Sequence, residues 1–398
     1  MTAQDQNEND GPALSFGLTT GLIISSNRGL DATSPGSTTE LTTRLDFDLR
    51  FATPIQSLTL SGDIGLRTAN GAESDDLDQG IFDPNVALDY TRQSRDAALN
   101  VSAFVAQRDV TSTFLQAIPD SANFDLLTDS GTLLRFGADT ALELRRQSPF
   151  GVTFSAGYTG LRYFDTTSPD LTDQDRFRLG AAFRFDLNPA LQATLDTRFS
   201  TFEDDGTDEG RRDTIAVNAG LRQSMSNGDI SLSFGATNTE DGTRYTLTGG
   251  RSFVMPSWTF AGSLGITRGV DGEIFTVGAL ALTHTLRNGL INAEFERSVV
   301  SSSDDIQQDI TTARTSYSTQ LNALTTFNVS LAYTERNDTG IDDDSSFGTI
   351  SLGLQRSLSR DWSMDIGLQH RIIKDSFGPD TRDNRLSLNL RRDLSIRR

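Results

Sequence analysis

The chain of 398 residues has no cysteine, so it can form neither a disulfide framework nor a thiolate metal site. It has two histidines and ten prolines, and no run of about 18 apolar residues that would form a transmembrane helix. Cations are in the minority, because 35 Lys and Arg stand against 54 Asp and Glu, which gives a formal charge of −19. Nucleic-acid phosphates are bound by clustered cations, so this balance disfavours nucleic acid as a partner.

The sequence is rich in a two-residue alternation of apolar and polar side chains. In residues 39–51, TELTTRLDFDLRF, Leu or Phe occupies most odd positions from Leu41 onward, and charged residues occupy most even positions. Successive side chains of a strand point to opposite faces, so this segment would have one apolar and one charged face. The same alternation recurs in residues 13–26, 131–146, 175–187, 258–267, 327–335, 347–356, 362–371 and 384–391. We find no convincing 3.6-residue periodicity, and the pattern therefore predicts an all-β chain.

The connectors between the predicted strands alternate between short and long. Short ones include TPIQ (53–56), NPA (188–190) and RNG (287–289), whereas long and mostly acidic ones include EDDGTDEG (203–210) and RNDTGIDDDSS (336–346). The segments between connectors number about 20, an even number, as in closed bacterial barrels. Tandem β-sandwiches would show Greek-key crossovers and domain linkers, and a β-solenoid would show a tight repeat. Regular alternation of loop length instead favours a closed up-and-down meander.

Over about residues 13–396 the chain resembles bacterial porin-like outer-membrane β-barrel proteins, in its strand and loop pattern and not in a fingerprint motif. Such barrels combine short periplasmic turns, long outer loops and strands of about 9–11 residues. The resemblance implies a single closed antiparallel transmembrane barrel of about 20 strands at residues 13–398, after a disordered periplasmic tail at residues 1–12. It also implies the outer membrane of a Gram-negative cell, contact with lipid and lipopolysaccharide, periplasmic termini and acidic loops that face outward.

Motifs for catalysis are absent from the sequence. It contains no G-x-S-x-G, no H-E-x-x-H and no phosphate-binding glycine loop, so we predict that the protein is not an enzyme. We also expect no cofactor and no dedicated metal site. The acidic connectors at residues 203–210 and 337–344 lack the ligand spacing of an EF-hand, and weak binding of divalent cations by them stays an alternative.

Strand alternation assigns a set of charged side chains to the barrel interior. Before about residue 200 the inward positions are mixed in charge, and later strands offer mainly Ser, Thr, Asn, Gln and Gly. The predicted pore-lining residues are Arg44, Asp46, Asp48, Arg50, Arg135, Asp139, Glu143, Arg145, Arg176, Arg178, Arg184, Asp186, Asp196 and Arg198. Two interpretations stay open: Arg–Asp pairs that brace and solvate the wall, or an electrostatic strip that selects anionic or sugar solutes.

The connector at residues 110–130 is the longest and the most apolar. Barrels of roughly 16–18 strands already enclose a water channel, so one of about 20 strands would need a loop to narrow it. In porins the third loop commonly folds into the lumen, and this connector is similar in position. The candidate constriction residues are Phe114, Leu115, Ile118, Asp120, Phe124, Asp125 and Leu126. A loop that binds a partner or lies on the rim is the competing interpretation.

The leading functional prediction is a channel that passes small hydrophilic solutes by diffusion through a partly charged lumen. The alternatives are the outer-membrane component of a polysaccharide or other export system, and a surface structural or adhesion barrel. A homo-oligomer or an export-system partner is compatible with the sequence, which leaves the solute undefined.

Overall fold

The computed structural model describes residues 11–74, 77, 79–110, 131–166, 171–206, 211–301, 307–338, 344–375 and 379–397. These residues form 20 strands in one sheet. The strands are β1 (Gly11–Ser25), β2 (Thr38–Thr53), β3 (Gln56–Gly71), β4 (Gly80–Gln93), β5 (Ala97–Asp109), β6 (Thr132–Leu144), β7 (Phe150–Phe164), β8 (Gln174–Asn188), β9 (Leu191–Asp204), β10 (Arg211–Met225), β11 (Gly228–Thr239), β12 (Gly242–Val254), β13 (Trp258–Arg268), β14 (Ile274–Thr285), β15 (Gly289–Ser301), β16 (Gln307–Asn322), β17 (Thr325–Asp338), β18 (Asp344–Ser357), β19 (Trp362–Asp375) and β20 (Thr381–Arg397).

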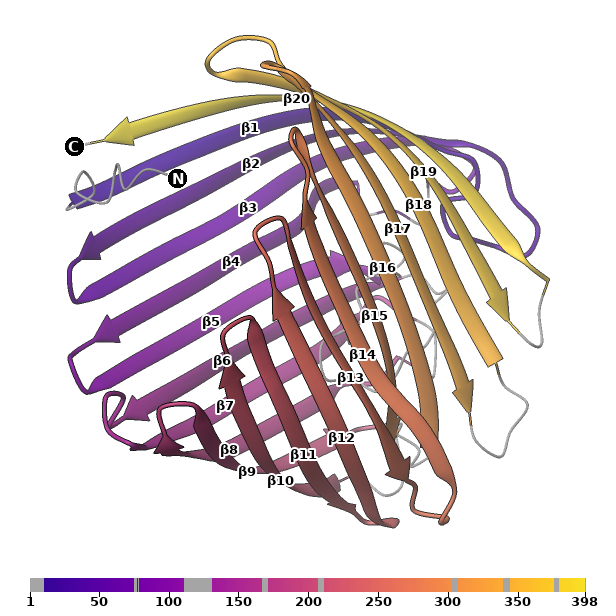
Figure 1. Ribbon diagram of the computed structural model, residues 1–398. Helices are drawn as coiled ribbons and strands as arrows, with labels where there is room; N and C mark the ends of the chain where they lie inside the picture. Colours follow the sequence, from indigo (N-terminus) through magenta and orange to yellow (C-terminus); the bar gives the residue numbers. More distant parts are fainter. Residues whose placement is uncertain are drawn as a thin grey trace.

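The sheet closes on itself. Each strand pairs antiparallel with its neighbours in sequence, and β20 also pairs with β1, from Ser25 opposite Arg385 to Ala13 opposite Arg397 (Figure 1). The prediction of an all-β chain that forms a single closed barrel of 20 antiparallel strands is therefore confirmed. In the part of the chain that the structure describes, no helix is long and apolar enough to cross a membrane.

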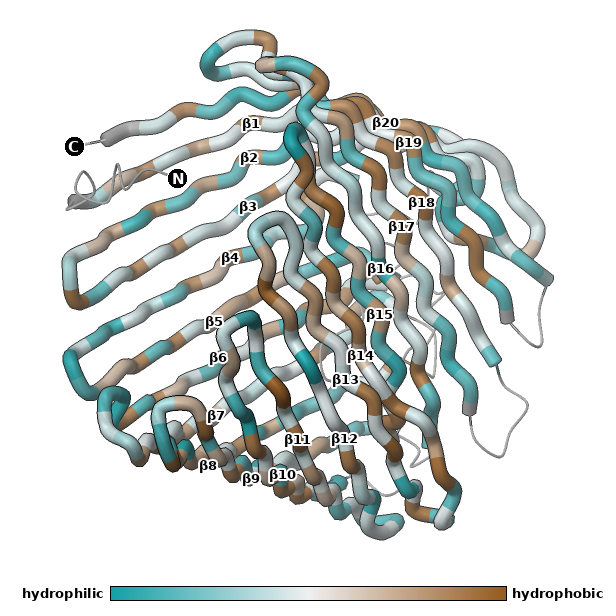
Figure 2. Tube along the Cα trace, in the orientation of Figure 1, coloured by the Kyte–Doolittle hydropathy of each residue, from teal (hydrophilic) through white to brown (hydrophobic). Residues whose placement is uncertain are grey.

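The alternation in sequence becomes an alternation between the outside and the inside of the barrel. Leu41, Leu45 and Phe51 of β2 are 54%, 45% and 38% exposed, and large apolar side chains are exposed on every strand from β1 to β20. Figure 2 shows the resulting alternation of hydrophobic and hydrophilic residues along the strands. Water would not solvate so large an apolar exterior, whereas the hydrocarbon of a membrane does.

The two ends of the barrel differ in their connectors. At the short-connector end, the turns that join β2 to β3, β4 to β5 and the later hairpins are two to five residues long, and the described ends of β1 and β20 lie on this side (Figure 1). Trp258 and Trp362 directly follow two of these turns, and Trp362 stacks under the guanidinium of Arg392 at 5.5 Å. Aromatic side chains at strand ends match the girdles that flank the apolar band of membrane barrels.

The long-connector end holds most of the buried side chains. Apart from Ala98 and Thr325, every buried side chain other than glycine in the described ranges lies at this end. One group is apolar and consists of Val110, Leu133, Leu161 and Leu171. Val110 is fully buried, and its backbone N–H donates to the carbonyl of Gly131 at 2.8 Å, which joins the two ends of a long connector.

Candidate functional site in the barrel interior

The interior wall formed by β4 to β10 is hollowed. The hollow measures about 780 Å³, and the side chains around it are polar or charged on the interior face and small in the middle. Ser155, Gly157 and Gly180 leave room at its centre. The charged residues that line it are Asp89, Asp139, Arg176, Arg178 and Arg198. Four of the predicted pore-lining residues therefore come together here: Asp139, Arg176, Arg178 and Arg198.

An ion pair in this hollow joins two strands that are separated by a third strand. Arg178 on β8 contacts Asp139 on β6 at 3.2 Å, although β7 lies between the two strands. Neighbouring strands are about 4.8 Å apart, so only a long side chain can span two of them. The intervening strand must also carry no side chain at this position, because a Cβ atom at Gly157 would lie 2.2 Å from Asp139 Oδ1. The sequence achieves this bridge by placing glycine opposite both charges.

The same arrangement braces the closure of the barrel. Arg391 on β20 reaches across β1 to Asp46 on β2, with contacts of 2.8 and 2.9 Å. Here Gly17 supplies the gap, since a Cβ atom would lie 2.4 Å from the Arg391 guanidinium. Arg391 also contacts Asp393 at 2.8 Å. The guanidinium therefore ties the last strand to the second one.

Other predicted residues make contacts within the wall. Arg44 pairs with Asp63, and Arg184 pairs with Asp186 and donates to the carbonyl of Arg146 at 2.8 Å. These contacts agree with the bracing interpretation at their positions.

The remaining charged positions lie apart from these braces. Arg135 lies over the Phe104 ring at 5.0 Å and Glu143 pairs with Arg146 at 3.2 Å, whereas Asp48, Arg50 and Asp196 are on the interior face of their strands. Arg176 stacks over the Phe202 ring at 5.2 Å. Arg198 lines the hollow, as Asp89 does, and makes no ion pair with another described residue.

One predicted pore-lining residue lies in a turn, and the constriction candidates cannot be placed. Arg145 is not a strand residue, because β6 ends at Leu144 and Arg145 adopts a left-handed φ of 57° in the turn that follows. Its guanidinium lies over the Phe150 ring at 5.4 Å, so strand alternation does not determine its direction. The constriction candidates Phe114, Leu115, Ile118, Asp120, Phe124, Asp125 and Leu126 lie outside the described residues. Strand β1 begins at Gly11, two residues before the predicted start of the barrel.

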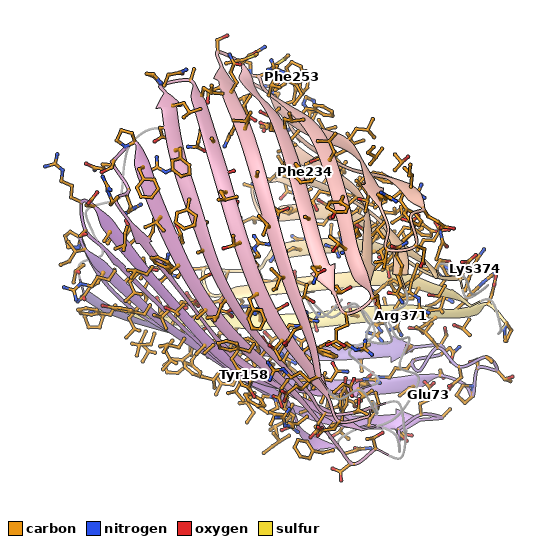
Figure 3. All side chains as sticks on the ribbon, turned by 90° about the horizontal axis from the view of Figure 1, so that it is seen from below. Glu73, Tyr158, Phe234, Phe253, Arg371 and Lys374 are labelled. Carbon is orange, nitrogen blue, oxygen red and sulfur yellow. The ribbon has the colours of Figure 1, made fainter. Side chains whose placement is uncertain are left out.

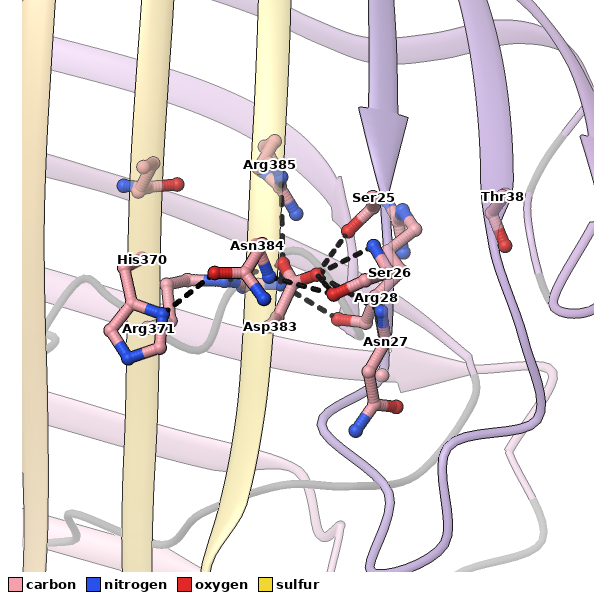
Figure 4. Close-up of polar contacts among 12 residues, drawn as sticks. Ser25, Ser26, Asn27, Arg28, Thr38, His370, Arg371, Asp383, Asn384 and Arg385 are labelled. Carbon is pink, nitrogen blue, oxygen red and sulfur yellow. Dashed lines mark hydrogen bonds and ion pairs between the residues drawn. The ribbon is translucent and has the colours of Figure 1, made fainter.

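A buried charge network at the long-connector end was not predicted from the sequence. Asp383 on β20 is fully buried and accepts hydrogen bonds from Ser25 Oγ at 2.7 Å and from the backbone N–H groups of Ser26 and Asn27, both at 3.0 Å (Figure 4). The guanidinium of Arg371 on β19 donates to the same carboxylate at 2.6 Å. One aspartate thus holds the seam between β20 and β1.

The network continues through the connector between β1 and β2. Arg28 pairs with Glu40 at 2.7 Å, and its own backbone N–H donates to Glu73 at 2.7 Å. Arg67 pairs with Asp109 at 2.9 Å. Glu73 and Arg371 lie at the same end of the barrel (Figure 3). Charged residues in strands next to long connectors were the signal in the sequence, but alternation does not show which of them pair, as Arg371 does with Asp383 on the neighbouring strand and Arg67 does with Asp109 across β4.

The described residues offer no evident metal centre, since they contain no group of three or more His, Asp or Glu side chains placed to hold an ion. No protein-family model and no curated protein sequence matches the chain. Solved structures do match in fold. The siderophore receptor PirA from Pseudomonas aeruginosa aligns with a TM-score of 0.53 and 11% identity over 96% of this chain and 80% of its own.

Two further structures are similar. The siderophore receptor PirA from Acinetobacter baumannii aligns with a TM-score of 0.55 and 8% identity, over 95% of this chain and 80% of its own. OpdK from Pseudomonas aeruginosa, solved with vanillate, aligns with a TM-score of 0.47 and 13% identity, over 98% of this chain and all of its own. The closed barrel of 20 strands with its apolar exterior has the fold of bacterial outer-membrane β-barrel proteins. At these identities the likeness concerns the fold alone.

Proposed function

We propose that this chain is a non-enzymatic outer-membrane channel through which small hydrophilic solutes diffuse. The observation that carries the proposal is the hollow in the interior wall, which is lined by Arg, Asp, Ser and Asn side chains. A polar interior in a barrel with an apolar exterior is the arrangement of water-filled channels. In this proposal the short-connector end and both termini are periplasmic, and the acidic connectors face the outside of the cell.

Anionic solutes are the class that the hollow suits best. Arg198 lines the hollow and makes no ion pair with another described residue, so its charge is the one best placed to meet a solute. Arg178 is engaged by Asp139 at 3.2 Å and serves mainly as a brace. Charged side chains that line a pore tune its ion selectivity. We therefore assign selection to Arg198, and bracing to Arg178.

The test is single-channel recording in planar bilayers. The wild-type barrel should give stable conducting steps with a preference for chloride over potassium in a salt gradient. Arg198→Glu should shift the reversal potential toward cations by replacing a positive with a negative charge. The matched control is Arg211→Glu, because Arg211 is exposed on the outward face of β10, beside Asp213.

The outcomes separate the two parts of the proposal. An unchanged reversal potential for Arg198→Glu would show that the charged side chains of the hollow brace the wall and do not select ions. A purified, folded barrel that never conducts would contradict the channel, and would leave export with a partner or a surface structural role as the functions to pursue.

A further inference from the structure

The two ends of the barrel have opposite charge. In the sequence, the ten connectors of the long-connector end contain 23 acidic residues and one basic residue, Arg28. The connectors of the short-connector end contain five arginines and two aspartates. The formal charge of −19 therefore originates mainly in the long connectors, whereas the short connectors are net positive.

Described charged side chains at both ends are exposed to the solution. The exposed acidic residues in long connectors include Asp31, Asp165, Asp205, Glu240, Asp241, Asp271 and Glu273. Arg95, Arg287 and Arg360 are exposed in short connectors. Arg95 donates to Gln147 at 3.1 Å, and this neutral amide leaves its charge in place.

The buried network does not cancel this polarity. Its cations are already matched, since Arg28 pairs with Glu40, Arg67 with Asp109 and Arg371 with Asp383. Each of these side chains is nearly or fully buried. The exposed carboxylates of the long connectors thus remain in excess.

We propose that the two mouths of the channel prefer ions of opposite sign, so that the current rectifies at low salt. Fixed charge at a pore mouth concentrates its counter-ions. When the long-connector side is positive, cations enter from the acidic mouth and anions from the arginine mouth, and both accumulate in the pore. When the voltage is reversed, both carriers are drawn out, and the conductance falls.

This inference rests on the proposed channel, and salt provides its first check. The Debye length is about 30 Å at 0.01 M salt and about 3 Å at 1 M salt. We expect the current at +100 mV on the long-connector side to exceed the current at −100 mV by about twofold or more in 0.01 M KCl, and the two to become equal at 1 M KCl.

The orientation of each inserted channel must be known. Because the chain has no cysteine, Ser94→Cys at the short-connector end and Glu240→Cys at the long-connector end give single thiols. A membrane-impermeant thiol reagent, added to one chamber, identifies the end that faces it. The recordings then assign a sign to the rectification.

Two sets of variants test the cause. Replacement of Arg95, Arg287 and Arg360 by Gln should reduce the current ratio toward one, and the same three positions replaced by Lys should retain it. Replacement of Glu240, Asp241, Asp271 and Glu273 by Gln or Asn should also reduce the ratio. All of these residues are exposed in turns, so folding should be preserved.

Three results would overturn the inference. They are equal currents at both polarities in 0.01 M KCl, rectification of the opposite sign, or a ratio that the Gln and Asn variants leave unchanged. Each of these is seen in a conducting channel and leaves the proposed function standing. The absence of any conductance would instead contradict the channel itself.

Discussion

Removal of the Asp383 carboxylate should destabilise the barrel more than removal of any exposed ion-pair partner. In Asp383→Ala the guanidinium of Arg371, which is 2% exposed, would lose the carboxylate that contacts it at 2.6 Å. Ser25 Oγ and the backbone N–H groups of Ser26 and Asn27 would lose their acceptor as well. Breaking a buried pair by removing one partner costs about 3–5 kcal/mol, because it leaves an uncompensated buried charge.

The matched control is Asp229→Ala. Asp229 pairs with Arg222 at 2.7 Å, but the Arg222 side chain is 59% exposed, so water can replace the lost partner. Exposed pairs contribute no more than about 1 kcal/mol. The measurement is urea unfolding of the barrel in lipid vesicles, followed by the fluorescence of its two tryptophans.

A double variant separates loss of the pair from loss of packing. Arg371→Met combined with Asp383→Leu removes both charges and should recover part of the stability that Asp383→Ala loses. If Asp383→Ala costs no more free energy of unfolding than Asp229→Ala, the seam does not depend on this carboxylate and the reasoning fails.

Two other substitutions probe the interior. Gly17→Ala should displace the guanidinium of Arg391 from Asp46 and lower the midpoint of urea unfolding slightly, by up to about 1 kcal/mol, since the pair is partly exposed. Gly249→Ala, with no atom within 4 Å of the new Cβ, is the control, and equal midpoints for the two variants would contradict the close approach. Leu161→Ala should cost about 2–5 kcal/mol, because Leu161 is 5% exposed in the apolar group at the long-connector end. A loss below 1 kcal/mol in the same assay would show that this group is loosely packed.

The fold was accessible from the sequence because its information is local. Leu45 and Asp46 are adjacent, and their difference in polarity predicts that one side chain is on the outside of the barrel and the other on the inside. Connector lengths then sorted the strand ends into two groups. Neither step requires knowledge of which distant residues meet, and both the strand count and the closed barrel followed from them.

The contacts of the site join residues that are far apart in the sequence, and local patterns do not show which of these residues meet. Arg178 and Asp139 are 39 residues apart, and their contact needs the registers of two successive ladders and a bare Gly157 between them. Ser25 and Asp383 are 358 residues apart and meet only because the barrel closes. Arg145 was misassigned to a strand for a related reason, since alternation continues by one residue into a turn where φ is positive.

The pairing of β1 with β20 also sets the order in which the protein can be assembled. Every other ladder joins strands that are consecutive in the chain, so each hairpin can form from neighbouring residues as they become available. The ladder between β1 and β20 has a very large sequence separation, and loop closure over such a length is entropically costly and slow. Until that step the free edges of β1 and β20 could pair with other chains. Asp383 accepts hydrogen bonds from four donors on the β1 side, namely the hydroxyls of Ser25 and Ser26 and the backbone N–H groups of Ser26 and Asn27. These bonds can form only when the two edges meet, so they stabilise the closed barrel and not its open precursor.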